Sequence, residues 1–175
     1  HTTININLET TTIGGTIRLN GNQMPNNTQQ YEEDQQRGWV RFTNIDSGDY
    51  LSAPFGATGQ ATYNVTLYKG KYKVELYPNS VGYQNVLPSM NIILASQVLI
   101  TGPVDLSYNL ETVTVGGTIS LNGGVMPTNT QQYEEDQIRG SVRFTNSGSG
   151  DYLQTGFGAA GLASYNVTLY KGSYK

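Results

Sequence analysis

A repeat of about 102 residues constrains the fold of this chain more than any other feature. When residue n is placed over residue n+102, residues 3–73 align with residues 105–175 without a gap, and about 50 of the 71 aligned positions are identical. Even the polar string NTQQYEEDQ, which begins at Asn27, recurs letter for letter from Asn129. Self-similarity at a fixed period indicates that one structural unit occurs more than once. The chain is therefore expected to contain tandem copies of one module.

The second copy is shorter than the first, because residues 74–104 have no counterpart before Lys175. We expect a first unit over 1–104 and a second unit over 105–175 that lacks the equivalent of 74–104. Two interpretations follow. The 175 residues are either a window on a longer array or a discrete subunit whose second unit is completed by a neighbour. The sequence begins at His1 without an initiator Met or a leader, which fits a processed chain or a window.

Within a unit, apolar and polar side chains alternate. TININLE places Ile4, Ile6 and Leu8 on one face, and ATYNVTLY (61–68) and KYKVELY (71–77) alternate in the same way. Such alternation is typical of half-buried strands with one wet face. Further strands are expected near 12–20, 37–44, 49–55, 91–100 and 104–111. Lys69 and Gly70 are expected to join two strands in a tight hairpin, with Gly70 at positive φ.

The number of short strands favours one fold class. Seven or eight of them in about 100 residues, with turns between, are typical of an antiparallel β-sandwich. Composition agrees, because the chain has 13 tyrosines, many Thr, Asn and Gly residues, and only 13% charged residues. We predict an all-β protein of tandem antiparallel β-sandwich units, Ig-like or transthyretin-like, with the second unit incomplete.

The strings GGTIRLNGNQMP, RGWVRF, YNVTLYKGKYKVELYP and NVLP resemble the tandem carboxypeptidase-regulatory-like modules of large secreted bacterial surface proteins. The matching positions are Gly15, Gly21, Pro25, Val40, Phe42, Leu67, Gly70, Tyr72 and Val74. The resemblance implies a transthyretin-like or Ig-like sandwich, export and tandem arrangement. It transfers no catalytic residue, and the unit here is longer than that module usually is.

Several kinds of chemistry are not expected. The net charge of −3 and the lack of a basic cluster argue against nucleic acid, and no apolar run is long enough to span a membrane. There is no cysteine, and His1 is the single histidine, so neither a nucleophile system nor a zinc ligand set can be assembled. We therefore expect no enzyme activity, no catalytic residue, no cofactor and no metal.

The repeated acidic string and the turn at Asn44 are the remaining candidates for chemistry. Paired acids can hydrolyse glycosides, but adjacent acids in one polar loop share an environment, which favours a solvated loop. Asn44, Asp46 and Asp49 have a spacing that suits calcium, yet the second copy has Gly148 at the position of Asp46. Turn chemistry is therefore the favoured interpretation of this stretch.

Three function classes remain open. The favoured one is a structural subunit or segment of an extracellular fibre or cell-surface array, in which copies of the chain, or further repeats of it, lie head to tail. Residues 3–9 would then be a strand donated to the open second unit of another copy, with Ile4, Ile6 and Leu8 as its apolar side chains. The alternatives are a secreted adhesin or carbohydrate-binding module, in which Trp39 and tyrosines stack on a glycan, and an accessory domain of a secreted enzyme.

Identity of the acidic string in both copies suggests a contact that recurs at every repeat. The residues of this expected contact loop are Gln30, Tyr31, Glu32, Glu33, Asp34, Gln132, Tyr133, Glu134, Glu135 and Asp136.

Overall fold

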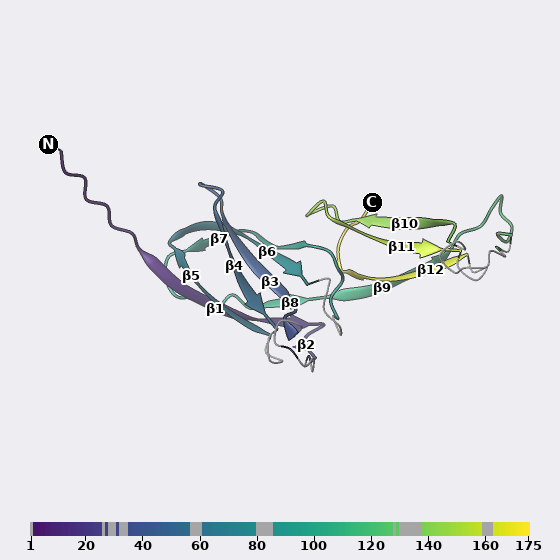
Figure 1. Cartoon of the computed structure of the whole chain (residues 1–175), viewed down its shortest axis with the longest axis horizontal. Helices are drawn as coiled ribbons and strands as arrows, with labels where there is room; N and C mark the ends of the chain where they lie inside the picture. Colours follow the sequence, from purple (N-terminus) through teal and green to yellow (C-terminus); the bar gives the residue numbers. More distant parts are fainter. Residues whose placement is uncertain are drawn as a thin grey trace. The chain divides into compact units, whose positions relative to one another are not determined.

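The computed structural model of the chain describes residues 2–25, 27, 31, 35–56, 61–79, 86–127, 129, 138–158 and 163–175. Within these residues all twelve elements are β-strands, so the predicted all-β class is confirmed. The chain divides into two compact units, His1–Leu110 and Glu111–Lys175 (Figure 1).

The first sheet of unit 1 is built around β1 (Thr10–Leu19). This strand pairs antiparallel with β5 (Thr62–Tyr68) and, at its end, with the short β2 (Asn22–Gln23). Its other edge carries β8 (Tyr108–Leu110), which runs parallel to β1. Asn20 and Gly21 have φ values of 52° and 80°, the two positive values that the type I′ turn between β1 and β2 requires.

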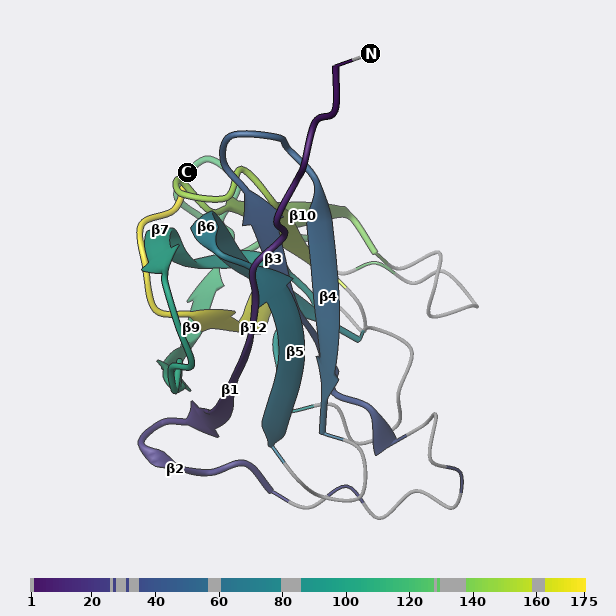
Figure 2. The same cartoon turned by 90° about the vertical axis from the view of Figure 1, so that its left-hand side faces the viewer.

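The second sheet of unit 1 has the strand order β4-β3-β6-β7, and all its pairs are antiparallel. Its strands are β3 (Gly38–Asn44), β4 (Tyr50–Phe55), β6 (Gly70–Pro78) and β7 (Ile92–Ile100) (Figures 1 and 2). Alternate side chains of both sheets face inward and form the core. Its most deeply buried members include Ile13, Ile17, Val40, Phe42, Phe55, Leu67, Val74, Leu76 and Ile100.

The predicted hairpin at Lys69 and Gly70 is wrong. Strand β5 belongs to the first sheet and β6 to the second, so these two residues form a corner between the sheets. Gly70 is also absent from the residues with positive φ. Alternation describes each strand equally well in either arrangement, and the true partners of β5 and β6 lie much further away in the sequence.

Unit 2 repeats the strand pairs of unit 1. Strands β9 (Thr112–Thr118) and β12 (Ser164–Tyr170) pair like β1 and β5, and β10 (Gly140–Thr145) and β11 (Tyr152–Phe157) pair like β3 and β4. The register is also kept, because Val115 faces Val167 just as Ile13 faces Val65. An isolated bridge between Asn146 and Tyr174 repeats the pairing of Asn44 with Tyr72. The last residues thus begin a counterpart of β6.

The N-terminal segment, residues 2–9, forms no strand and extends away from the start of β1 in both views (purple, Figures 1 and 2). Ile4 and Ile6 are each 79% exposed and Leu8 is 67% exposed. The half-buried strand expected here is therefore wrong for the isolated chain, because none of the described strands pairs with this segment. We call residues 2–8 the N-terminal arm.

Candidate assembly site

The site is the edge of β1 in unit 1, where residues 104–110 complete the first sheet. The backbone N–H of Leu106 donates to the carbonyl of Gly14 at 2.8 Å, and Gly14 N–H donates to Val104 at 3.3 Å. Further along, Asn20 N–H donates to the carbonyl of Leu110 at 2.7 Å. We call residues 104–110 the closing strand, because they satisfy backbone groups that would otherwise form an open sheet edge.

Side chains add to this closure. Ser107 Oγ accepts from the Thr16 N–H at 3.0 Å, and Asn109 Oδ1 accepts from the Gly21 N–H at 2.7 Å. The Tyr63 hydroxyl donates to the Leu106 carbonyl, and burial raises the pKa of Tyr63 well above its ordinary value. Leu110 is only 2% exposed. The closing strand is therefore held by backbone bonds, side-chain bonds and apolar burial together.

Gly15 allows the closing strand to approach β1. A Cβ atom at this position would overlap the backbone carbonyl of Leu106, which cannot move without displacing the strand. Glycine within a strand lowers stability, and often marks a place where another backbone comes close. The close approach of Leu106 explains why this strand carries a glycine.

The equivalent edge of unit 2 has no closing strand within the described residues, where β9 pairs with β12 alone. The Tyr165 ring stands near Phe144 with ring centroids 6.1 Å apart, as Tyr63 stands near Phe42 at 6.0 Å. The Tyr165 hydroxyl, however, lies 2.7 Å from the place that a Cβ of Gly117 would occupy. In unit 1 the carbonyl of the closing strand stands over the equivalent glycine.

Both units have an open groove beside the glycine pair of the first sheet. The groove of unit 1 has a volume of about 580 Å³, and Pro103, Val104 and Asp105 form one of its walls. The groove of unit 2, about 600 Å³, is lined by β9, β11 and β12 residues, including Gly116 and Tyr165. No counterpart of the wall formed by 103–105 is among its lining residues.

The counterpart of the closing strand in the first repeat is the N-terminal arm. Residues 2–8 correspond to 104–110, and Asn7 and Leu8 are identical to Asn109 and Leu110.

The repeat register placed the boundary between units after residue 104, whereas the compact units divide after Leu110. The reason is that the closing strand, although it begins the second repeat in sequence, bonds to β1.

The expected contact loop lies mostly outside the described residues. Gln30, Glu32, Glu33, Asp34 and all five residues of the second loop, Gln132, Tyr133, Glu134, Glu135 and Asp136, belong to the parts of the chain that the structure leaves undescribed. Tyr31 is described and is 58% exposed. The repeated contact therefore stays a prediction.

Two arginines that follow these loops in the sequence bond to the prolines that precede them, and sequence reasoning did not single them out. Arg37 Nη2 donates to the carbonyl of Pro25 at 2.6 Å, and Arg139 Nη2 donates to the carbonyl of Pro127. Burial lowers the pKa of Arg37 from its ordinary value. The identical spacing of Pro and Arg in the two copies was the signal available in the sequence.

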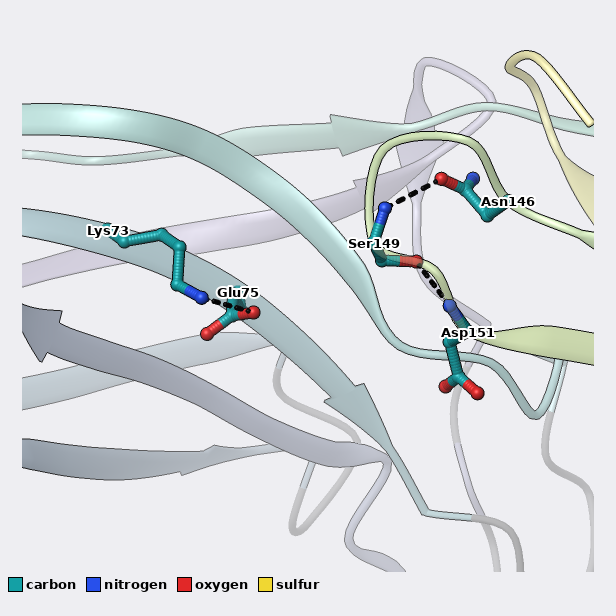
Figure 3. A network of polar contacts seen from close by, with 5 residues as sticks. All are labelled: Lys73, Glu75, Asn146, Ser149 and Asp151. Carbon is teal, nitrogen blue, oxygen red and sulfur yellow. Dashed lines mark hydrogen bonds and ion pairs between the residues drawn. The ribbon is translucent and has the colours of Figure 1, made fainter.

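The candidate calcium residues form the same turn in both units. Asn44 Oδ1 accepts from the N–H groups of Asp46 and Ser47 at 2.9 and 3.0 Å. In unit 2, Asn146 Oδ1 accepts from Gly148 and Ser149 in the same way, and Ser149 Oγ accepts from the Asp151 N–H at 3.3 Å (Figure 3). Since Gly148 replaces Asp46 without changing the turn, the Asn side chain shapes it.

The outer face of the second sheet carries polar and aromatic contacts. Trp39 is 38% exposed and lies opposite Pro54 and Tyr77. The Arg41 guanidinium stacks on the rings of Tyr50 and Tyr77, 4.3 and 3.9 Å from their centroids. Lys73 and Glu75 form an ion pair at 3.0 Å (Figure 3).

Two absences hold for the described part of the chain. It contains no cluster of three or more His, Cys, Asp or Glu side chains that could hold a metal ion. It also contains no helix of the length and apolarity needed to cross a membrane.

Comparisons with known proteins give little further identification. No protein-family model and no curated protein matches the chain. A leucine-rich repeat protein from Bacteroides thetaiotaomicron VPI-5482 is 15% identical, with a TM-score of 0.38 over 94% of this chain and 21% of that chain. The Bacillus anthracis TIE protein is 9% identical, with a TM-score of 0.36 over 94% of this chain and 27% of that chain.

A DUF3823 family protein from Parabacteroides merdae ATCC 43184 is also 9% identical, with a TM-score of 0.38 over 95% of this chain and 83% of that chain. The chain thus spans 21% and 27% of the length of the first two structures. These TM-scores are too low to carry an argument about fold or function. The resemblance to carboxypeptidase-regulatory-like modules therefore stays a prediction, and the chain is similar to these bacterial proteins at low identity.

Proposed function

We propose that this chain is a structural subunit or segment of an extracellular fibre or surface array built from end-to-end β-sandwich repeats. In this array, the strand that begins each repeat closes the unit before it. The observation that supports the proposal is the closing strand, which starts the second repeat in sequence and hydrogen-bonds to β1 of the first.

This mode of closure favours growth in one direction. The surface that gives the strand and the edge that receives it are different, so the contact is heterologous and does not close on itself. The corresponding edge of β9 has no strand partner among the described residues, and the N-terminal arm keeps Asn7, Leu8 and the apolar alternation of the giving strand. A chain with one free donor and one free acceptor is suited to a linear assembly.

Electron microscopy and the mass of the native material test this function together. We expect filaments or an extended array whose repeat distance corresponds to one or two sandwich units. A denatured mass near 19.1 kDa would identify a discrete subunit, and a much larger mass would identify a covalent array of repeats. A soluble monomer with two complete, independently unfolding units would contradict the proposal.

A secreted adhesin or carbohydrate-binding module is the second candidate function, and one observation favours it. Unit 1 has a hollow of about 330 Å³ at one end of the sandwich, and exposed Tyr50 and Tyr68 are among its lining residues. All nine lining residues are identical in the second copy. Tyrosine rings can stack on sugars. Glycan-array binding that Tyr50→Ala abolishes would favour this candidate, and no binding to any glycan would count against it.

A further inference from the structure

We infer that the free edge of β9 in unit 2 accepts the N-terminal arm of a second copy of this chain as a parallel strand, in the register that the closing strand takes on β1. The inference rests on the proposed function and names its partner and its register. Subtracting 102 from the closing-strand residues gives the donor residues, and adding 102 to the β1 residues gives the acceptor residues.

The backbone contacts follow from those of unit 1. Leu106 N–H to Gly14 becomes Ile4 N–H of one copy to the carbonyl of Gly116 of the other. Asn20 N–H to Leu110 becomes Asn122 N–H to the carbonyl of Leu8. These bonds engage β-edge groups that the described part of the chain leaves without a strand partner.

The side chains of the arm have the alternation that this register needs. Ile4, Ile6 and Leu8 take the places of Leu106, Tyr108 and Leu110, so an apolar side chain stands at each inward position. All three are exposed in the isolated chain, whereas Leu110 is buried in unit 1. Leu106 and Tyr108 are half-buried in unit 1, so docking is expected to bury Leu8 and to cover part of Ile4 and Ile6, which favours association.

A polar contact also sets the register. Asn7 is identical to Asn109, whose Oδ1 accepts from the N–H of Gly21. Gly123 is the counterpart of Gly21 and has nearly the same φ, 77° against 80°. Asn7 Oδ1 of the donor is thus expected to accept from the Gly123 N–H of the acceptor.

Gly117 and Tyr165 carry the strongest evidence for an acceptor. In unit 1, a Cβ at Gly15 would overlap the backbone of the closing strand, whereas the atoms nearest to a Cβ at Gly117 belong to the side chain of Tyr165. A glycine inside a strand is unfavourable unless another backbone comes close to it. A donor strand that passes over Gly117 would explain why this strand carries a glycine. The donor would displace the Tyr165 hydroxyl, and this hydroxyl would then donate a hydrogen bond to the Ile4 carbonyl, as Tyr63 does to Leu106 in unit 1.

Cysteine trapping tests the register directly, because the natural chain has no cysteine. Asn109 and Arg18 are direct partners in unit 1, so Asn7 and Ser120 are the expected partners between copies, and all four residues are exposed. Chains carrying Asn7→Cys are mixed with chains carrying Ser120→Cys and oxidised. We expect a disulfide-linked species of twice 19.1 kDa.

Three controls test whether the cross-link is specific to the proposed register. Arg18→Cys with Asn109→Cys in one chain should form an internal disulfide and shows that the geometry permits the bond. Asn5→Cys replaces Asn7→Cys as a donor displaced by two residues and should cross-link far less. Gly117→Val in the acceptor should lower the cross-linked fraction by an order of magnitude, which corresponds to about 1.4 kcal/mol.

Folding of the Gly117→Val chain is checked by circular dichroism. Ile4→Asp with Ile6→Asp in the donor provides a second block that leaves the sandwich units untouched, because both side chains are exposed. Cross-linking at Asn7 that either block abolishes supports the inference. Filaments without this cross-link, or with equal cross-linking at Asn5, would overturn the inference but not the proposed function. The absence of both filaments and the cross-link would overturn both.

Discussion

The two units contain the same strands but are buried to different degrees. Val40 and Phe42 are fully buried in unit 1, whereas their counterparts Val142 and Phe144 are half-buried in unit 2. Phe55 and its counterpart Phe157 differ in the same way. Since these residues are identical between the units, the difference comes from what covers them. Unit 1 has β6, β7 and the closing strand, and the 175 residues hold only the beginning of a second β6.

The comparison separates strand pairing from core formation. Each strand pair of unit 2 keeps the register of its counterpart in unit 1 without the remaining strands. Its apolar faces nevertheless remain partly open, because a sandwich core needs both sheets to be complete. Among the described residues, unit 2 therefore leaves open the edges and faces that β6, β7 and the closing strand cover in unit 1.

The largest expected difference concerns the buried phenylalanine. Phe42→Ala should lower the free energy of unfolding of unit 1 by about 4 kcal/mol, because it leaves a cavity in a closed core. Phe144→Ala should cost roughly half as much, since its ring is already partly exposed. Trp39, the single tryptophan, reports on unit 1 during urea unfolding, and circular dichroism reports on both units. Equal losses of stability in both units would show that the core of unit 2 is as closed as that of unit 1.

The next largest difference in stability is expected between two leucines at the same position of each repeat, Leu8 and Leu110. Leu110→Ala should destabilise unit 1 by about 3 kcal/mol, because this side chain is buried in the first sheet. Leu8→Ala should change the stability of the dilute monomer by less than about 0.5 kcal/mol. The measurement is again urea unfolding followed by Trp39 fluorescence. Destabilisation of the monomer by Leu8→Ala would show that the arm packs within its own chain.

The Asn turn should be equally important in both units. Asn44→Ala and Asn146→Ala each remove an oxygen that accepts two backbone N–H groups, so each should cost about 1 kcal/mol. Thermal unfolding of each variant measures this cost, with Asp46→Gly as a control that copies the second repeat. A large effect in one unit and none in the other would show that the turn depends on the completeness of the sandwich.

The smallest expected effect concerns the exposed ion pairs, Glu9 with Lys69 at 2.6 Å and Glu111 with Lys171 at 2.8 Å. The hydrogen bond and charge of Lys69 lower the pKa of Glu9, so its contribution is present above the ordinary Glu pKa and is lost as pH falls through the lowered value. Glu111 raises the pKa of Lys171, whose contribution is lost only as pH rises through that raised value.

Because both pairs are solvated, Glu9→Gln should shift the melting temperature only slightly, and added salt should remove the difference. The melting temperatures of both proteins are compared from acid to neutral pH. A large loss of stability at neutral pH would mean that the pair anchors the start of β1.

Much of the fold was predictable because its signals are local. The sequence patterns located β1, β3, β4, β5, β6 and β7 to within a few residues. The hairpin at Lys69 was wrong because alternation does not specify which strands pair. For the candidate site, the sequence suggested that Ile4, Ile6 and Leu8 enter the open second unit of another copy. It did not indicate the edge or the register, since Gly117 and Tyr165 matter only through contacts seen in unit 1.

The sequence by itself determined the repeat, the all-β class and the position of most strands, because these depend on identity at a fixed spacing and on the two-residue period of a strand. Only the tertiary structure decided that residues 104–110 belong to the sheet of the preceding unit. That assignment depends on a backbone approach over Gly15 and on hydrogen bonds between residues about 90 positions apart, such as Leu106 with Gly14. Such long-range contacts leave no periodic trace in the chain, so they are visible only once it is folded.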